Sequence, residues 1–577
     1  MTNNKFEQWR QTGEAADWHT DESLNTLSRG YLIDNESPKD MYKRLAAGAA
    51  KELDRPDLEG RFFDLFWNNW LCPATPVSSN FNSSRGLPIS CYCSHVEDST
   101  DSIFNNYHEG AMLTKNGGGL GKYWGDVRGS GVSISGGGSS TGVVPWLKIE
   151  DQIISGIAQS STRRGASANY LPIDHVDIEE FLDIRRQTGD VARRCRSLGF
   201  HHAVCIDDYW MEELVAGDLE KRRLWSKLLV TRFETGEPYI MFRGNANNQA
   251  PQMYKDLGLE IKSSNLCSEI MLHTSKDSTF VCCLSSLNLV RYDEWKETDT
   301  VELAIYFLDA VMSEFIRKAK KKVGFKNAVR FAEKSRALGL GVLGWHELLQ
   351  RKHLPFDSFE SMQLNNEIFR LMKEDSYKAS AQLASKYGEP DWCKGYGVRN
   401  THTLAVAPTL SNSIISGVFS EGIQPVISNT FAQKTAKGTF IRRNPVLEEK
   451  LSTLGKNNID VWSEINANKG SVKTLDFLSE EDKNIFKTAR EINQFSLIKQ
   501  AAQRQRYIDQ GQSLNLFFTQ PETGNTKEEM IVGRYVHETH LEAWKLGLKS
   551  LYYLKSESAI KGDSMFSASS DCAACEG

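Results

Sequence analysis

Residues 262–270 read KSSNLCSEI, and the interpretation of the whole chain starts from this stretch. Asn265, Cys267 and Glu269 are spaced two apart, so in an extended segment their side chains would face one space. A neighbouring carboxylate disfavours a thiolate, so we expect Cys267 to be a neutral thiol beside an acid/base group. That arrangement suits hydrogen-atom chemistry coupled to proton transfer. The triplet alone leaves open a structural alternative, a buried cysteine between polar residues.

The composition is that of an ordinary globular protein. Of 577 residues, 40% are hydrophobic and 25% are charged, and the formal net charge is −5. We expect no nucleic-acid partner, and the basic run RKAKKK at 317–322 is interpreted as the solvated end of a helix. No apolar run is long enough to span a bilayer, and the N-terminus lacks the apolar core of a signal peptide. We therefore expect a cytoplasmic protein with no membrane partner.

The chain divides into three parts by hydrophobic periodicity. Helical spacing predicts a helical N-terminal region over 1–73. Short apolar runs then alternate with helical patterns, which predicts an α/β domain over 74–555. Residues 556–577 are small and polar and are expected to form a mobile tail.

Within the α/β part, a strand is expected at Ile89–Cys93. A helix should follow with Asp98 as its N-cap and Asp101 three residues later, as in a capping box. A second helix should bury one apolar stripe, made of Trp146, Ile149, Ile153 and Ile157.

Three short motifs indicate other functions, and each is weak. GLGVLG at 339–344 has the form of a dinucleotide-binding turn, but no buried strand precedes it, so a closely packed backbone is the better interpretation. GGGLGKY at 117–123 has one residue too few for a Walker loop, and Tyr123 replaces the Ser or Thr that would bind magnesium.

The third motif is CAAC at 572–575. The eleven cysteines are odd in number and scattered, which argues against a disulfide framework. No second pair has metal-ligand spacing, so no metal site is expected. Cys572 and Cys575 are interpreted as an accessible dithiol on a tether that can exchange disulfides elsewhere, or else as part of an inert tail.

Together, several motifs resemble the ribonucleotide reductase catalytic (large, alpha) subunit. SNLCSEI is similar to the family's finger loop, LPISCYC to its first active-site cysteine segment, and FVCCLSSLNL to its second. RALGLGVLG, APTLSNS, SEGIQP and SLYYLKS also occur in the family's order, from about Tyr31 to the C-terminus. The resemblance implies an α/β barrel of ten strands. Two five-stranded halves are arranged antiparallel around a central finger loop, with a helical N-terminal region outside.

The resemblance also implies roles for the cysteines. Cys267 would become a thiyl radical and take the 3′ hydrogen of the substrate ribose, while Glu269 accepts the 3′-hydroxyl proton and Asn265 holds the hydroxyls. Cys91 and Cys282 would supply two electrons and become a disulfide. Cys93 and Cys283 are expected to face away from that pair. Cys572 and Cys575 would re-reduce the pair and be reduced in turn by a thioredoxin or glutaredoxin.

Substrate binding and the radical source follow from the same resemblance. The substrate, a ribonucleoside diphosphate, would contact Thr75, Ser90, Thr409, Ser411, Asn412 and Ser413. Tyr552 and Tyr553 resemble the class I tyrosine pair that relays an electron hole from a ferritin-like small (beta) subunit carrying a metal-dependent oxidant; the alternative is two strand aromatics facing opposite sides. No cofactor is expected in this chain itself.

The alternatives are a class II enzyme using adenosylcobalamin, a nicotinamide-linked oxidoreductase using GLGVLG, and a catalytically inactive binding homologue.

Regulation is implied as well. The helices over about 98–160 resemble the pair that binds a dNTP or ATP effector and forms an effector-dependent homodimer. Candidate effector contacts are Asp98, Arg128, Gln159 and Arg163. The short stretch before the resemblance leads us to expect a form without the family's N-terminal ATP-cone, and hence no overall activity switch.

Overall fold

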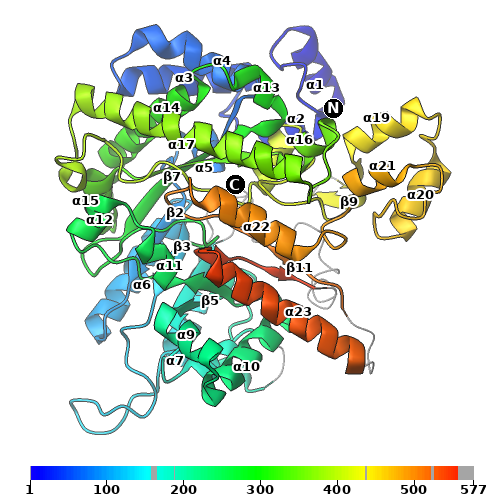
Figure 1. Cartoon of the computed structure of the whole chain (residues 1–577). Helices are drawn as coiled ribbons and strands as arrows, with labels where there is room; N and C mark the ends of the chain where they lie inside the picture. The colour runs from blue at the N-terminus through cyan, green and yellow to red at the C-terminus, as the bar shows by residue number, and fades with distance from the viewer. Residues whose placement is uncertain (1, 158–164, 187–188, 436–437, 521–525, 557–577) are drawn as a thin grey trace.

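The computed structural model describes residues 2–157, 165–186, 189–435, 438–520 and 526–556. Four helices come first, drawn in blue in Figure 1: α1 (Thr2–Gln11), α2 (Asp21–Ser28), α3 (Pro38–Glu52) and α4 (Glu59–Trp67). The start of α3 is set by a capping box, in which the Ser37 hydroxyl accepts from the Asp40 N–H and Asp40 accepts from the Ser37 N–H. The aromatic face of α4 packs on the barrel's outer layer, with Phe66 5.0 Å from Phe307 between ring centroids.

The first half of the barrel has five parallel strands: β2 (Cys91–His95), β3 (Gly119–Tyr123), β4 (Ser167–Pro172), β5 (Phe200–Ile206) and β6 (Tyr239–Phe242). Their connections carry α6 (Thr100–Lys115), α7 (Val144–Gly156), α8 (Ile178–Leu182), α9 (Asp208–Ala216) and α10 (Leu219–Thr235). All residues of β3, β4, β5 and β6 are buried, as expected of a parallel sheet covered on both faces.

The second half also runs parallel. β7 (Phe280–Asn288) pairs with β8 (Leu338–Leu343), which bridges to Leu404, and Val406 bridges to Gln512. β11 (Leu516–Phe517) then pairs with β13 (Leu554–Lys555), which directly follows β12 (Ser550–Leu551). Helices α14 (Thr300–Ala319), α15 (Lys326–Ser335), α16 (Trp345–Arg351), α17 (Phe359–Tyr387), α22 (Gln494–Gln505) and α23 (Thr526–Lys545) cover this half.

The two halves meet at two antiparallel seams. At the first seam β2 pairs with β7, and Cys91 is the register partner of Cys282. At the second seam β6 pairs with β12, and Met241 is the register partner of Ser550. The predicted α/β barrel with a helical N-terminal region is therefore confirmed.

Further elements decorate the barrel. They are β1 (Leu71–Pro73), α5 (Thr75–Asn80), α11 (Arg243–Asn248), α12 (Gln252–Asp256), α13 (Tyr292–Trp295), α18 (Leu410–Ile415), β9 (Thr430–Thr435), β10 (Gly438–Arg443), α19 (Pro445–Thr453), α20 (Ile459–Ala467) and α21 (Glu480–Ile485). Helices α19, α20 and α21 stand out to one side in Figure 1 and have a small apolar core of their own that includes Leu447, Leu451 and Ile465.

Both glycine motifs lie in strands rather than in phosphate-binding turns. GLGVLG supplies β8, and a Cβ at Gly341 would come within 2.5 Å of the Ala405 carbonyl oxygen. The expected close packing of backbones is thus confirmed, and the dinucleotide-binding interpretation is wrong because the motif is itself the strand. The last five residues of GGGLGKY form β3.

Three local predictions need correction. The strand predicted at Ile89–Cys93 is β2, two residues later. The helix predicted to be capped by Asp98 begins at Thr100 and is capped by Ser99, because Asp98 instead accepts two hydrogen bonds from Arg128.

The stripe predicted for the second helix faces the core only in part: Trp146 and Ile153 are half-buried and pack against the core. Helix α7 buries Leu147 and Ile154, whereas the side chain of Ile149 is 39% exposed. The period was right, but the most deeply buried residues, Leu147 and Ile154, lie on the neighbouring face, which leaves Ile149 on the outside.

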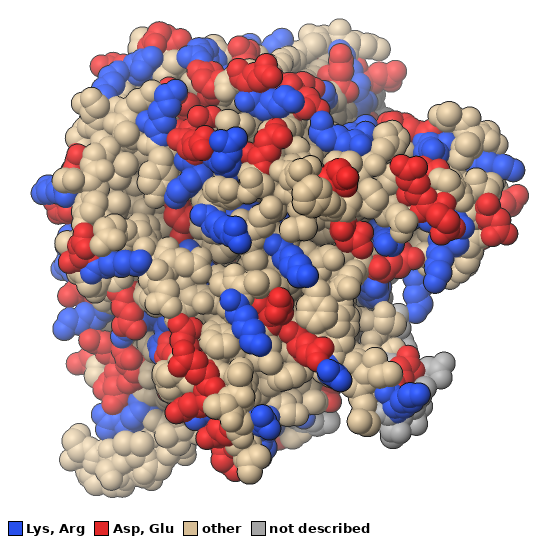
Figure 2. All heavy atoms as spheres, viewed as in Figure 1, with Lys and Arg blue, Asp and Glu red and all other residues tan. Residues whose placement is uncertain are grey.

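The surface carries both signs of charge. On the face shown in Figure 2, Lys and Arg side chains are interspersed with Asp and Glu, without an extended basic track. No helix in the described ranges is long and apolar enough to cross a membrane.

Candidate active site

The finger loop, residues 261–273, has neither helix nor strand and lies between α12 and β7. Ser268 adopts a left-handed conformation (φ +62°), and its N–H reaches the Asn265 carbonyl at 3.4 Å. The loop therefore turns at this point and is not extended. Asn265, Cys267 and Glu269 nevertheless line the same cleft. The predicted convergence is correct, while the extended geometry assumed for it is wrong.

Glycines in β3 make room for the finger loop inside the barrel. A Cβ at Gly121 would lie 2.0 Å from the Ser264 carbonyl oxygen, and one at Gly119 would lie 2.9 Å from the Leu266 side chain. Because a backbone carbonyl cannot swing aside, the stem of the loop fits only against glycine at position 121, whereas the end of the Leu266 side chain could move away from position 119. The Tyr170 hydroxyl of β4 donates to the Asn265 carbonyl at 2.5 Å.

The second half of the barrel holds the other side of the finger loop. The Ser513 hydroxyl donates to the Cys267 carbonyl at 2.6 Å, and the Ser550 hydroxyl donates to the Ser268 carbonyl at 2.7 Å. The Gly511 N–H donates to the Glu269 carbonyl at 2.7 Å. The thiol is thus carried on a backbone that both halves hold in place.

Polar atoms converge beside Cys267. The Asn265 amide donates to Glu269 Oε1 at 3.0 Å and to the Cys91 sulfur at 3.6 Å. Ser513 Oγ lies 3.2 Å from Glu269 Oε2. Cys267 is 8% exposed and Glu269 is 1% exposed. These contacts place a carboxylate next to a thiol in a nearly dry site, where neutral amide and hydroxyl groups orient the carboxylate.

Cys91 and Cys282 face each other across the first seam. Directly opposite residues in an antiparallel pair have Cα atoms about 4.5–5.5 Å apart, which is within the range that a disulfide spans. The Gln510 amide donates to the Cys282 sulfur at 3.3 Å. Burial raises the pKa of Cys282 well above its ordinary value, so this thiol keeps its proton.

The neighbouring cysteines differ from the expectation in one respect. Cys283 lies on the opposite face of β7 from Cys282, as expected. Cys93 lies on the same face as Cys91, because a spacing of two repeats the direction of a strand side chain. Its sulfur lies 3.1 Å from the Ser263 hydroxyl in the finger-loop stem, and burial raises the pKa of this thiol to about 12. The expectation that Cys93 faces away was therefore wrong.

Tyr552 and Tyr553 occupy the break between β12 and β13. Their ring centroids are 4.4 Å apart, so they contact each other and do not face opposite sides of a strand. Tyr239 of β6 lies 4.6 Å from Tyr552 and 5.0 Å from Tyr553. Tyr552 is buried and Tyr553 is partly exposed, which gives the pair an inner and an outer member.

The predicted substrate contacts are only partly brought together. Ser90, Thr409 and Asn412 line the cleft with Cys91 and Cys267. The other three predicted contacts lie outside its lining: Thr75, whose hydroxyl lies 2.8 Å from the Tyr31 hydroxyl, and Ser411 and Ser413, both in the short helix α18.

Sequence reasoning assigned no role to four residues that line or support the cleft: Ser285, Ser286, Gln510 and Ser513. The first two lie within the segment FVCCLSSLNL, whereas no motif marks Gln510 or Ser513.

Asp98 and Arg128 are brought together outside the barrel. Arg128 Nε donates to Asp98 Oδ2 at 2.7 Å, and both side chains are 35% exposed. Gln159, Arg163, Cys572 and Cys575 lie outside the described residues. No group of three or more His, Cys, Asp or Glu in the described ranges is arranged to hold a metal ion.

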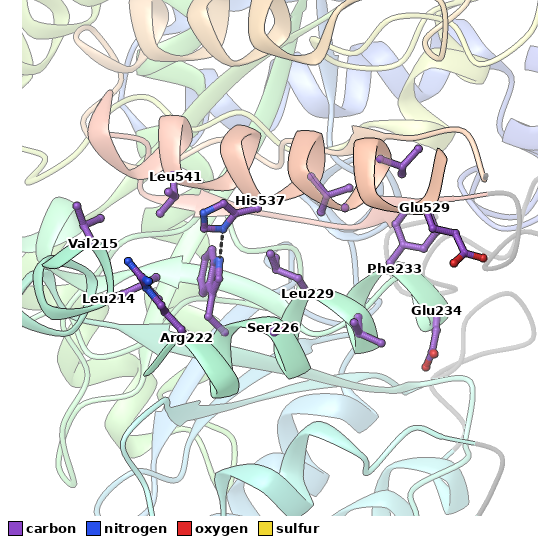
Figure 3. Close-up of a pocket in the computed structure, with 15 residues that line it drawn as sticks. Leu214, Val215, Arg222, Ser226, Leu229, Phe233, Glu234, Glu529, His537 and Leu541 are labelled. Carbon is purple, nitrogen blue, oxygen red and sulfur yellow. Dashed lines mark hydrogen bonds between the residues drawn. The ribbon is translucent and has the colours of Figure 1, made fainter. Parts of the chain in front are cut away.

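A much larger hollow lies away from the thiols, between α10 and α23 (Figure 3). Its volume is about 960 Å³, against about 40 Å³ for the cleft at Cys267, so size does not locate the chemistry here. Its lining is mainly apolar and includes Leu229, Phe233 and Leu541, while His537 accepts a hydrogen bond from the Trp225 indole at 2.9 Å. We call this hollow the α10–α23 groove.

Comparison with known proteins agrees with this geometry. The family model "Ribonucleotide reductase, barrel domain" matches residues 89–221, 212–392 and 390–554, and "Ribonucleotide reductase, all-alpha domain" matches residues 18–86. A protein of Frog virus 3 (isolate Goorha) assigned to the ribonucleoside-diphosphate reductase large subunits is 38% identical, over 91% of this chain and 93% of its own.

The ribonucleoside-diphosphate reductase large subunit of Invertebrate iridescent virus 3 is 32% identical, over 96% of this chain and 98% of its own. Among solved structures, the Actinobacillus ureae class Id ribonucleotide reductase alpha subunit is 42% identical with a TM-score of 0.86, over 94% of this chain and 97% of that one.

Proposed function

Because this chain belongs to the ribonucleotide reductase family of large subunits, we propose that it reduces ribonucleoside diphosphates to 2′-deoxyribonucleoside diphosphates. The observation that carries the proposal is the convergence of Cys267, Glu269 and Asn265 in one cleft, with Cys91 facing Cys282 at its wall. That set contains a hydrogen-atom acceptor, a base and a two-electron reductant.

The reaction begins at Cys267. A thiyl radical there takes the 3′ hydrogen atom of the ribose, and Glu269 accepts the 3′-hydroxyl proton as the 2′-hydroxyl leaves as water with a proton from the cysteine pair. Cys91 and Cys282 supply two electrons and a second proton, which reduce C2′, and form a disulfide, while Glu269 returns its proton to the 3′ oxygen. The Cys267 thiol then returns the hydrogen atom to C3′, which regenerates the radical. The Asn265 amide already bonds Glu269, so a substrate hydroxyl beside it would join an oriented network.

The radical comes from a separate small subunit in this proposal. An oxidant on that subunit removes an electron from Tyr553. Tyr552 then supplies an electron to Tyr553, and Cys267 supplies one to Tyr552, which leaves the thiyl radical on Cys267. The partly exposed Tyr553 is the outer member, and the buried Tyr552 is joined through its N–H to Leu514, next to the Ser513 that holds Cys267.

The α10–α23 groove is the surface we propose for the small subunit. The Ser556 hydroxyl donates to the carbonyl of Phe233, so the groove begins three residues beyond Tyr553. Val215 and Val230 on its rim are 47% and 48% exposed, and an apolar surface of this kind marks an interaction site. An apolar segment of the small subunit fits it.

A homodimer is part of the same proposal. Phe104 of α6 is 55% exposed and packs edge-on against Trp146 of α7, beside the exposed Ile149. A second copy of these helices would cover Phe104 and Ile149. We place a nucleotide effector at Asp98, just before α6, and at its partner Arg128. Gln159 and Arg163, which follow α7 in the sequence, remain the other candidate contacts. Residues 556–577 would act as a redox tail, with Cys572 and Cys575 passing electrons from a thioredoxin or glutaredoxin.

The test is an assay of the purified chain with each candidate small subunit, a dithiol reductant and a ribonucleoside diphosphate. We expect deoxynucleotide only when both subunits are present. A ribonucleoside triphosphate in the same assay tests the substrate class. Turnover by this chain alone with adenosylcobalamin would overturn the class I mechanism.

A further inference from the structure

A histidine and a glutamate lie beside the outer tyrosine of the relay. The Tyr553 hydroxyl lies 3.4 Å from Nδ1 of His201, the second residue of β5. The same nitrogen lies 2.7 Å from Oε1 of Glu237, just before β6. His201 is 3% exposed and Glu237 is 4% exposed. The phenol, the imidazole and the carboxylate thus form a short polar chain in a largely dry environment.

This chain is held rigidly from several sides. The second carboxylate oxygen of Glu237 accepts from the His202 N–H at 3.2 Å and lies 3.1 Å from His202 Nδ1. The Leu554 N–H donates to the carbonyl of Gly236, which ties the residue after Tyr553 to the residue before Glu237. The ring of Tyr239 stacks on His201, with centroids 6.0 Å apart.

The carboxylate is ionised. Burial by itself would raise the pKa of Glu237, but the charges and hydrogen bonds of His201 and His202, with Arg185 at 4.0 Å, hold this pKa well below its ordinary value. Burial lowers the pKa of His202. Three titratable groups, His201, His202 and Arg185, therefore face Glu237, and together they keep a negative charge near the phenol.

Oxidation of a phenol needs somewhere for its proton to go. A tyrosine that loses an electron becomes a strong acid, and a cation left in a dry site is costly. A base within hydrogen-bond reach removes that cost, and such contacts are often long before the reacting complex forms. His201 is placed for this role, whereas His202 contacts the same carboxylate and packs edge-on against Phe181.

We propose that the His201–Glu237 pair accepts the phenolic proton of Tyr553 when that tyrosine is oxidised: the proton moves to Nδ1 of His201 as the Nδ1 proton moves to Glu237. This rests on the proposed function, in which the oxidant belongs to the small subunit. One electron leaves Tyr553 for that oxidant, and one proton moves onto the His201–Glu237 pair. When Tyr552 supplies an electron to Tyr553, the pair returns the proton and the phenol is restored. Charge and atoms balance in each direction.

The first test reads the contact without turnover. Tyr553 is replaced by 3-nitrotyrosine in the full chain, and its ionisation is followed by visible absorbance. His201→Phe removes an N–H that stabilises the phenolate and should raise the probe's pKa; Glu237→Gln removes a negative charge and should lower it. His202→Phe, matched in size and burial, should shift it by less than half as much.

The second test measures turnover with the small subunit across pH. His201→Phe should lower kcat by about 10- to 100-fold with KM changed less than twofold, and the loss should shrink as pH rises because hydroxide replaces the missing base. Glu237→Gln, which keeps its shape, should show the same trend, and His202→Phe should remain within about threefold of the wild type.

The proposal is overturned if neither His201→Phe nor Glu237→Gln changes the pKa of the probe. It is also overturned if His202→Phe loses as much activity as His201→Phe, with the same pH dependence. If the wild-type chain shows no reductase activity at all, the proposed function fails. The pKa of the 3-nitrotyrosine probe still reports whether His201 and Glu237 affect the ionisation of the phenol.

Discussion

Cys91 on β2 and Cys282 on β7 are register partners across the seam that joins the two halves of the barrel. Each sulfur also accepts a hydrogen bond from a side-chain amide, that of Asn265 at 3.6 Å for Cys91 and that of Gln510 at 3.3 Å for Cys282. The pair is therefore aligned by the sheet and oriented by two further residues.

The pairing predicts different outcomes for adjacent cysteines. Cys91→Ala or Cys282→Ala should lower turnover by at least about 10³-fold, since no second thiol is left to complete the disulfide. Nucleotide binding, measured by calorimetry, should stay within about threefold. Cys283→Ala is the matched control, because this side chain lies on the other face of β7; activity within about threefold of the wild type is expected. Equal losses at all three positions would contradict the assignment.

Gly121→Ala should displace the finger loop. Its Cβ would meet the Ser264 carbonyl at 2.0 Å, and a backbone atom cannot swing aside as a side chain can. Overpacking of this kind costs about 1–3 kcal/mol or more, so the thermal midpoint should fall and turnover should be lost. Gly60→Ala in α4, where nothing lies within 4 Å, should instead stabilise the chain slightly. A Gly121→Ala variant that is fully active and as stable as the wild type would show that the backbone at Ser264 can move to accommodate the new Cβ.

Tyr552→Phe should abolish turnover and leave nucleotide binding intact. The ring and its contacts with Tyr239 and Tyr553 are kept, and only the oxidisable hydroxyl is removed. Tyr209→Phe, at a side chain 48% exposed, is the control and should keep full activity. Multiple-turnover assays with the small subunit measure both, and an active Tyr552→Phe variant would remove this residue from the relay.

Ile149→Lys should weaken the homodimer. Ile149 is 39% exposed on the outer side of α7, so a charge there costs little in the monomer but would be desolvated at the proposed interface. Sedimentation with the effector should show a dissociation constant raised by at least about tenfold. Ile459→Lys, 67% exposed on the distant α20, should leave the constant unchanged. A dimer that is equally strong in both variants would move the interface elsewhere.

Acid should destabilise the protein through its buried histidines. Burial lowers the pKa of His346 and His402 from 6.5 to about 3. Between these values the unfolded chain binds the proton and the native chain does not, so the free energy of unfolding falls as pH falls from about 6.5 to about 3.

His346→Asn should reduce that dependence, and Asn can still accept from the Val426 N–H. Urea midpoints at pH 7, 6 and 5 measure the slope, with His108→Asn on the exposed face of α6 as the control. An unchanged slope for His346→Asn would mean that His346 does not contribute to it.

The sequence predicted what depends on local order and on the motif set. Asn265, Cys267 and Glu269 do converge, and the barrel and helical N-terminal region were anticipated. The turn at Ser268 was not, because a left-handed residue other than glycine leaves no reliable trace in a pattern of side chains.

Contacts between residues far apart in the chain could not be predicted from the sequence either. Ser513 holds the carbonyl of Cys267 across 246 residues, and only the closure of the barrel brings them together. Helix α7 shows a related limit: its period could be read from the sequence, but which of its apolar residues are buried most deeply depends on what packs against them.

The register of the two barrel seams determines whether a folded chain can be active. One seam sets the thiol pair, and the other leads straight into Tyr552 and Tyr553. A slip of one residue along a strand is about 3.4 Å and turns every side chain to the opposite face. A barrel closed out of register would therefore lose both its electron source and its route for the radical. Misassembled chains would therefore be inactive and would not release a reactive radical intermediate. Catalysis would require that the barrel close in the correct register.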